Sequence, residues 1–321
     1  MQRRTLFAAA ASASLALPAA AQEWPSGPVR GIVPFAAGSA TDIVARLFAE
    51  RMRESLGQPV VVENRAGASG LIGAEAVARA PADGNTLLFG TNSTNAAANA
   101  LFRRVPFDME RDFAPVSLLA SVPLLVAVPT ASPHRTLNDL LAAARARPDA
   151  VTFASASASQ RVAAEMLGSM AGVRMLHVPY RASPAAIQDI IAGRVDVFIA
   201  DQAVILPAVQ GGQLRVLGVT TRERSPQLPE LPTVAEAGNL PNYELFAWFV
   251  LVAPTGTPAA NITRLNAAVR QASANPELRQ RLEQVLGMTV TPSTPEEAAA
   301  FMRSETVKWT NAIRAAGIEP E

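Results

Sequence analysis

The stretch of the 321-residue sequence best suited to holding an acid group is Ala36-Ala37-Gly38-Ser39-Ala40-Thr41-Asp42. An apolar run of strand type, residues 29–35, ends at this stretch, and apolar residues recur at helical spacing from Ile43 onward. The first turn of a helix has backbone N–H groups without intrahelical partners and the positive end of the helix dipole. Small residues let a ligand approach that backbone closely. We therefore predict an anion-binding turn whose candidate contacts are Phe35, Ala36, Ala37, Gly38, Ser39, Thr41 and Asp42.

The same residues support a purely structural interpretation. Ser39 and Asp42 have the spacing of a capping box, in which the two side chains satisfy the start of the helix between themselves. Both interpretations stay open at this point.

Two further turns in the first third of the chain carry polar or small residues at strand ends. Residues 65–70 follow the strand expected at 59–63, and Ala68 and Ser69 are the candidate contacts there. Residues 67–73 have the spacing G-x-x-G-x-x-G, which does not match a dinucleotide-binding loop. Asn92 and Ser93 follow the strand expected at 85–90 and either contact a polar ligand or cap a turn.

The middle of the chain offers a second set of candidate contacts. Ser157 and Ser159 precede a helical pattern, where hydroxyls and free N–H groups would suit a carboxylate. Tyr180 ends a strand and could supply a phenolic hydrogen bond, and Asp201 ends another and could accept from an ammonium or a hydroxyl. The alternatives are a half-buried aromatic ring and a helix-capping carboxylate. Arg181 has the geometry of a carboxylate clamp, but an arginine after a strand is more often solvated.

These candidates require a scaffold that brings strand ends together. We expect strands at 29–35, 59–63 and 85–90 alternating with helices at 41–55 and 71–80, which indicates a parallel α/β sheet with ligands at the carboxyl ends of its strands. The alternation restarts between residues 123 and 246, and the chain returns through a strand at 244–254. We therefore predict two α/β domains, 22–122 plus 250–321 and an inserted 123–249. Hinges are expected at 121–124 and 247–250.

Composition points to an exported globular protein. Arg3 and Arg4 precede an apolar run and Ala19-Ala20-Ala21, so residues 1–21 read as a cleavable signal peptide. Its removal would change the formal net charge from +1 to −1, since 26 basic residues would face 27 acidic ones. Such a surface gives no electrostatic case for nucleic acid or membrane binding. With no cysteine there is no disulfide or lipid-anchoring thiol, and we expect a freely diffusing periplasmic monomer.

The sequence gives little support for catalysis. His134 and His177 are the two histidines, and no H-E-x-x-H or Cys/His cluster is present, so we expect neither a metal nor another cofactor. Residues 67–70 lack the G-x-S-x-G spacing of a hydrolase.

Seven segments in order along the chain carry a resemblance to a known family. They are residues 33–42, 57–68 (GQPVVVENRAGA), 83–88 (DGNTLL), 111–116 (RDFAPV), 178–181 (VPYR), 231–238 (LPTVAEAG) and 253–258 (APTGTP). This series is similar to the substrate-binding receptors of tripartite tricarboxylate transporters, the Bug family of periplasmic receptors. The family pattern usually has paired glycines in the first turn, where this chain has Gly38-Ser39.

The resemblance implies a two-domain periplasmic binding protein of the Venus-flytrap type. It also implies capture of a di- or tricarboxylate, an acidic amino acid or an aromatic acid, and delivery to a two-component membrane permease. We expect the N–H groups of Ala37 and Gly38 to hold one carboxylate, and Ser157, Ser159 and Tyr180 to face it across the cleft. A carboxylate sensor or a partner-binding module on the same fold is the alternative, and an enzyme is not expected.

Overall fold

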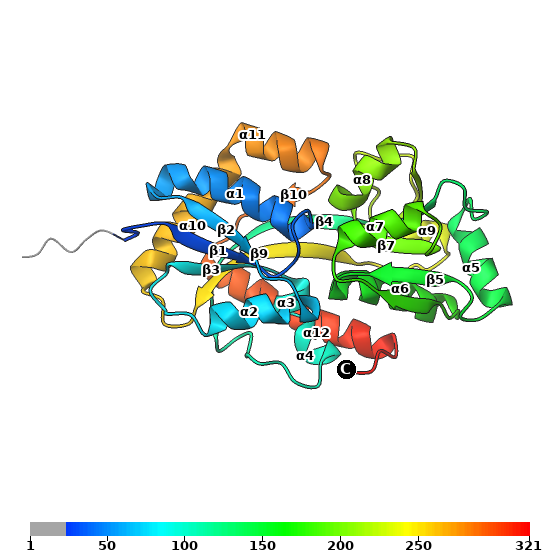
Figure 1. The fold of residues 1–321 in the computed structure, drawn as a ribbon, viewed down its shortest axis with the longest axis horizontal. Helices are drawn as coiled ribbons and strands as arrows, with labels where there is room; N and C mark the ends of the chain where they lie inside the picture. Colours follow the sequence, from blue (N-terminus) through cyan, green and yellow to red (C-terminus); the bar gives the residue numbers. More distant parts are fainter. Residues whose placement is uncertain (1–23) are drawn as a thin grey trace, which may run out of the picture.

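The computed structural model describes residues 24–321, so the predicted signal peptide at 1–21 lies outside the described residues. Strands and helices alternate along the chain and form two halves joined by strands β4 and β9 (Figure 1). We call these halves the first and the second lobe.

The first lobe is built on a mixed sheet with the strand order β2-β1-β3-β9-β4. β1 runs parallel to β2 and β3, whereas β9 is antiparallel to β3 and β4, and β10 is antiparallel to β4. The parallel arrangement predicted for the strands at 29–35, 59–63 and 85–90 is therefore confirmed, and β9 is antiparallel because it returns from the second lobe in the opposite direction. The strands are β1 Val29–Val33, β2 Val60–Asn64, β3 Thr86–Thr91, β4 Phe113–Pro129, β9 Phe246–Pro254 and β10 Thr289–Val290.

Helices cover both faces of this sheet, with α1 and α11 on one side and α2 and α12 on the other (Figure 1). Helix α1 forms because Val44, Phe48 and Met52 recur on one face, which is buried, and it ends at Gly57, whose φ is +71°. The helices of this lobe are α1 Ala40–Leu56, a 3₁₀ turn Ala68–Gly70, α2 Leu71–Ala78, α3 Asn92–Asn95, α4 Ala98–Leu101, α10 Ala259–Ala274, α11 Pro276–Arg279, a π-helical turn Gln280–Val285 and α12 Pro295–Ala315.

The second lobe has the strand order β4-β7-β5-β6, and β8 pairs with β4 as well. Its elements are α5 Leu137–Ala146, β5 Thr152–Ser155, α6 Ala158–Ala171, β6 Leu176–Pro179, α7 Ser183–Ile191, β7 Val197–Asp201, α8 Gln202–Gln210, β8 Leu214–Val219 and α9 Val234–Ala237. The sequence pattern gives no expectation of α8, because its run is apolar on most sides and contains Pro207.

Strand β4 belongs to both lobes. Its residues up to Pro123 pair with β9 or β10, and its residues from Leu124 pair with β7 and β8. This change of partners falls inside the predicted hinge at 121–124. β9 pairs with first-lobe strands along its whole length, from Phe246 onward. The division into residues 22–122 plus 250–321 and residues 123–249 stays a prediction.

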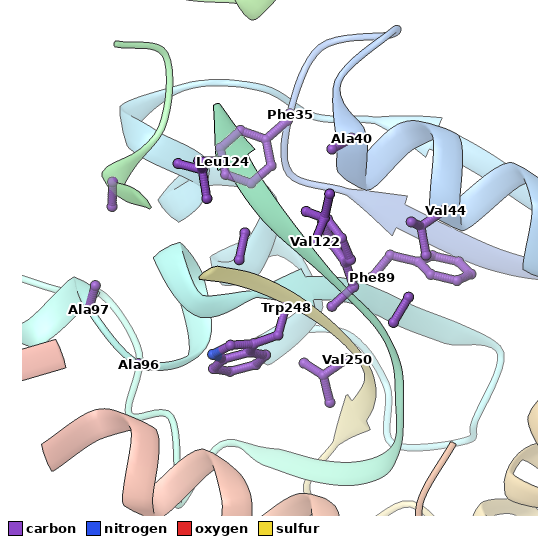
Figure 2. Packing of buried hydrophobic residues seen from close by; sticks show 14 of the residues in the cluster. Phe35, Ala40, Val44, Phe89, Ala96, Ala97, Val122, Leu124, Trp248 and Val250 are labelled. Atoms are coloured by element: carbon purple, nitrogen blue, oxygen red, sulfur yellow. The ribbon is translucent and has the colours of Figure 1, made fainter. Parts of the chain in front are cut away.

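The largest buried cluster spans both lobes and the crossing between them. Figure 2 shows Phe35 and Val44 of the first lobe, Trp248 of β9 and Leu124 of β4 within it. Trp248 meets the ring of Phe301 on α12 edge-on, with centroids 5.2 Å apart. This contact and the burial of Trp309 pack α12 against the first sheet.

A buried carboxylate ties α12 to β9. Glu305 Oε2 accepts from Trp248 Nε1 at 2.8 Å and from Trp309 Nε1 at 3.0 Å, and Glu305 is 5% exposed. Lys308 Nζ lies 3.6 Å from Glu305 Oε1. One carboxylate therefore accepts hydrogen bonds from two buried indole N–H groups.

Replacing Glu305 with alanine should lower the free energy of unfolding by about 2–4 kcal/mol, because it leaves two buried N–H donors unpaired and opens a cavity. Chemical denaturation measures this loss. Glu296→Ala, an exposed change in the first turn of the same helix, should cost less than about 1 kcal/mol. Equal losses in the two variants would contradict the role given to Glu305.

Candidate functional site

A narrow cavity lies between the two lobes where several helices begin. The free space between its walls amounts to about 390 Å³. We call this space the inner cavity. It is lined by Phe35, Ala36, Ser39, Ala40, Thr41, Thr91, Ser93, Ala156, Ser157, Ser159, Gln160, Arg181, Ala182, Ser183, Asp201 and Phe249.

The start of α1 forms one wall of the inner cavity. Ser39 is the N-cap, and its Oγ accepts from the backbone N–H of Asp42 at 3.3 Å. Asp42 Oδ2 in turn accepts from the N–H of Gly38 at 3.0 Å. The capping interpretation is thus realised, with Gly38 in place of Ser39 as the backbone donor. In the described part of the chain, the N–H groups of Ala40 and Thr41 have no acceptor, as expected for a first helical turn.

These contacts change which residues of the turn can meet a ligand. Ala37 and Gly38 are exposed and do not line the inner cavity, and the N–H of Gly38 is already bonded to Asp42. In this structure the N–H of Gly38 therefore already has an acceptor in Asp42, and its contact with a carboxylate stays a prediction. The sequence could not settle this, because a capping carboxylate and a ligand carboxylate compete for the same donor.

Asp42 is a positioning residue and does not line the cavity. Its carboxylate also accepts from Asn64 Nδ2 at 2.8 Å and from Arg46 Nε at 3.0 Å, and Asn64 Nδ2 donates to the carbonyl of Phe35. Burial raises the pKa of Asp42, but the hydrogen bonds from Arg46, Asn64 and Gly38 outweigh it and hold that pKa below its usual range. The turn after β1 is therefore rigidly held from behind.

The short helix α3, which follows β3, contains two residues with different roles. Asn92 Oδ1 accepts from Thr91 Oγ1 at 2.8 Å and from the N–H of Trp248 at 3.4 Å, so it braces β9 and does not line the cavity. Ser93 does line the inner cavity, is 1% exposed, and has no hydrogen-bond partner for its Oγ among the described residues. An unpaired buried hydroxyl is unusual and indicates a position where a ligand or a water completes the bonding.

The start of α6 forms the opposite wall. Ser157 is the N-cap, and its Oγ lies 3.0 Å from Ser159 Oγ. Gln160 Oε1 accepts from the N–H of Ala156 at 2.7 Å, and Gln160 Nε2 donates to Ser183 Oγ at 3.1 Å. Within the described chain, the N–H groups of Ala158 and Ser159 have no acceptor. Two helix beginnings with free donors thus face one cavity.

Asp201 ends β7 at the bottom of the inner cavity. It is 7% exposed, and its Oδ2 lies 3.4 Å from Gln160 Nε2. Burial raises the pKa of Asp201 to about 6, against the lowering effect of hydrogen bonds from Gln160 and from its own backbone.

The remaining predicted residues lie at a wider outer cavity beside the inner one. Ala68, Ser69 and Tyr180 line it, and both cavities share Phe35, Ala156 and Arg181. Ala68 and Ser69 have φ values of +46° and +51°, an uncommon conformation for residues other than glycine. The hydroxyl of Tyr180 donates to Asp189 Oδ2 at 2.8 Å, and burial together with this carboxylate raises the pKa of Tyr180 to about 12.

Several lining residues were not among the contacts predicted from the sequence. They include Gln160, Ser183 and Arg181. Gln160 stands three residues after an N-cap serine, and Ser183 precedes a proline at a helix start, so both carried a capping signal. Residues 24–321 contain no group of three or more His, Cys, Asp or Glu that could hold a metal ion.

Two α/β lobes joined by crossing strands, with a polar cavity between facing helix starts, define a solute-binding protein. Comparison with known protein families shows to which group of solute-binding proteins the chain belongs. The family model of the tripartite tricarboxylate transporter family receptor matches residues 44–318, so the chain belongs to that family.

Relatives and solved structures agree with this assignment. The chain is 43% identical over 293 residues to a UPF0065 protein of the tcbD-tcbE intergenic region in Pseudomonas sp. strain P51, covering 90% of this chain and 86% of the relative. It is 34% identical over 310 residues to the protein BugT of Bordetella pertussis, covering 96% and 94%. The structure of R. palustris Rpa4515 with adipate superimposes with a TM-score of 0.90 at 35% identity, covering 93% of this chain and 100% of that one. The family and these neighbours confirm the predicted fold class and family, whose members are periplasmic solute-binding receptors and not enzymes.

Asp42→Asn should destabilise the protein by about 1–3 kcal/mol near neutral pH, because it removes a buried charge that accepts from three donors. The folded pKa of Asp42 is lowered, so its contribution is present above the unfolded value of about 3.9 and is lost as pH falls through the folded pKa. The difference between wild type and variant should therefore shrink in acid. Urea unfolding at pH 7 and pH 3 measures it, and a difference that grows in acid would contradict the assignment.

Proposed function

We propose that this protein is an extracytoplasmic receptor that binds a small carboxylate in the inner cavity and passes it to a two-component permease of the tripartite tricarboxylate type. The observation that carries the proposal is the pair of facing helix starts. Ala40 and Thr41 in α1, and Ala158 and Ser159 in α6, offer four backbone N–H groups without acceptors in the described chain. Oriented backbone N–H groups and the positive ends of helix dipoles favour an anion between them.

The side chains around these donors support an acid as the ligand. Ser93 adds a buried hydroxyl without a partner, and Ser39, Ser157 and Ser159 add further hydroxyls. Arg181 lines the outer end of the inner cavity, and no ion pair to it occurs among residues 24–321. Backbone donors and hydroxyls can hold a carboxylate directly or through ordered water.

The receptor role is supported by the family to which the chain belongs. Among the described residues no helix is long and apolar enough to cross a membrane. The family name pairs such a receptor with a transporter, and the solved relative Rpa4515 was described with adipate. We infer export through residues 1–21 and action as a monomer in the periplasm.

The experiment that tests the proposal is a thermal-shift titration with mono-, di- and tricarboxylates, acidic amino acids and aromatic acids, followed by calorimetry of each hit. A ligand that binds the native state raises the melting temperature, and the rise grows with the logarithm of the ligand concentration relative to Kd. Binding of at least one acid supports the receptor. Failure of every acid would favour a partner-binding module, and chemical turnover of a bound acid would favour an enzyme.

Ser93→Ala should weaken binding of the acid found above by about 5- to 100-fold, since a hydrogen bond to a charged group contributes about 1–3 kcal/mol. The fold should be unaffected, because the hydroxyl has no partner within the described protein. Ser273→Ala is a matched control, since it also removes a buried hydroxyl without a partner, but from α10, away from the cavity. Calorimetry should give wild-type affinity for Ser273→Ala. Equal affinities for all three proteins would contradict the contact.

A further inference from the structure

Asp201 differs chemically from the rest of the inner cavity. The other polar groups that line it are hydroxyls, the Gln160 amide and the Arg181 guanidinium, together with free backbone N–H groups. A carboxylate cannot donate once ionised and can only accept. A cavity arranged to bind an acid therefore also contains a buried acid of its own.

The protein leaves Asp201 poorly satisfied. Its one side-chain partner in the described chain is Gln160, at the long distance of 3.4 Å. The orientation of the Gln160 amide is fixed, because its Oε1 accepts from the N–H of Ala156 at 2.7 Å and Nε2 must then face Ser183 and Asp201. The two hydrogens of Nε2 can serve both acceptors, of which Ser183 Oγ, at 3.1 Å, is the nearer. A carboxylate that is buried without a cation or several donors costs free energy unless a ligand supplies the missing contact.

From this geometry we propose that Asp201 is a specificity residue that selects acids carrying a hydroxyl or ammonium group beside the carboxylate. This inference rests on the proposed function, because the acid group itself would be held at the facing helix starts. The donor of the ligand would then reach Asp201 at the end of β7, where Leu124 of β4 pairs with it. An acid without such a donor would leave the carboxylate of Asp201 unpaired and would bind more weakly.

Because the charge of Asp201 changes with pH, its proposed role predicts a pH-dependent preference among ligands. Its pKa of about 6 means that the carboxylate is mostly ionised at pH 7.5 and mostly protonated at pH 5. As an acceptor it should favour hydroxy and amino acids at the higher pH, and this preference should fall as pH falls through about 6. The charged or titratable groups on elements around it are Arg181 before α7, Arg161 and Glu165 on α6, His177 on β6, Asp189 on α7 and Asp42 on α1.

Burial raises the pKa of Glu165, but neither Glu165 nor His177 lines the inner cavity, where the ligand would meet Asp201. His177 Nε2 lies 2.7 Å from Ser155 Oγ, its ring stacks on Phe153, and burial lowers its pKa. Arg161 pairs with Glu321, and Asp189 pairs with Arg194. Asp42 has a lowered pKa and stays ionised throughout this range.

The test compares a parent acid with its own derivatives. The carboxylate panel supplies the chain length that binds best, and calorimetry then measures the unsubstituted diacid, its 2-hydroxy form and its 2-amino form, for example succinate, malate and aspartate. At pH 7.5 the wild type should bind at least one substituted acid about tenfold or more tightly than the parent. Asp201→Asn should reduce that ratio to below about threefold. Asp149→Asn, the same change at an exposed residue of the second lobe, should leave it intact.

Circular dichroism checks that Asp201→Asn is folded, and the pH series on the unmodified protein tests the inference without any substitution. Equal binding of parent and substituted acids, unchanged in Asp201→Asn, would overturn the role of Asp201 while leaving the carboxylate receptor in place. A wild-type preference that rises on acidification from pH 7.5 to pH 5 would also overturn it, because Asp201 would then donate to the ligand. Failure of all carboxylates to bind would instead overturn the proposed function, and this inference with it.

Discussion

The site depends on a constraint of helix geometry, since the first residues of every α-helix have N–H groups that no carbonyl of the same helix can reach. Here the first turns of α1 and α6 face one another across a single cavity, and each leaves two such groups without an acceptor in the described protein. A chain can leave buried donors in this state only at a free-energy cost. An anion between the two turns removes that cost on both sides at once, which is why the proposed site needs little formal charge of its own.

The donors can serve this purpose because other side chains hold the turns from behind. Asp42 fixes the turn after β1 through Gly38, Asn64 and Arg46, and Gln160 fixes the turn before α6 through Ala156. The carboxylate of Asp42 and Oε1 of Gln160 hold the backbone, so these atoms are not free to contact a ligand. The polar groups of the site thus form two sets, those that hold the turns in place and those that are free to bind a ligand. A substitution in the first set lowers the stability of the protein, and it changes ligand affinity only through that loss.

Sequence patterns predicted the family, the alternation of strands and helices, and the segments that reach the cavity, because strand ends and small-residue turns are local signals. They did not predict the antiparallel β9, since direction depends on where a strand returns from. They did not indicate that the N–H of Gly38 bonds to Asp42, or that Asn92 Oδ1 accepts from Thr91 and Trp248. A sequence gives the donors and acceptors of each turn, but the pairing among them is decided by residues far away, such as Asn64 for the α1 turn.

The continuity of strand β4 affects how the protein unfolds. Its residues from Phe113 to Pro123 complete the first sheet, and those from Leu124 to Pro129 complete the second, without a break in the strand. Unfolding of either sheet would remove the hydrogen-bond partners of one part of β4, while the rest of the strand is still paired in the other sheet. The two halves are therefore coupled as one cooperative unit, and heating should produce a single calorimetric transition with no half-folded species.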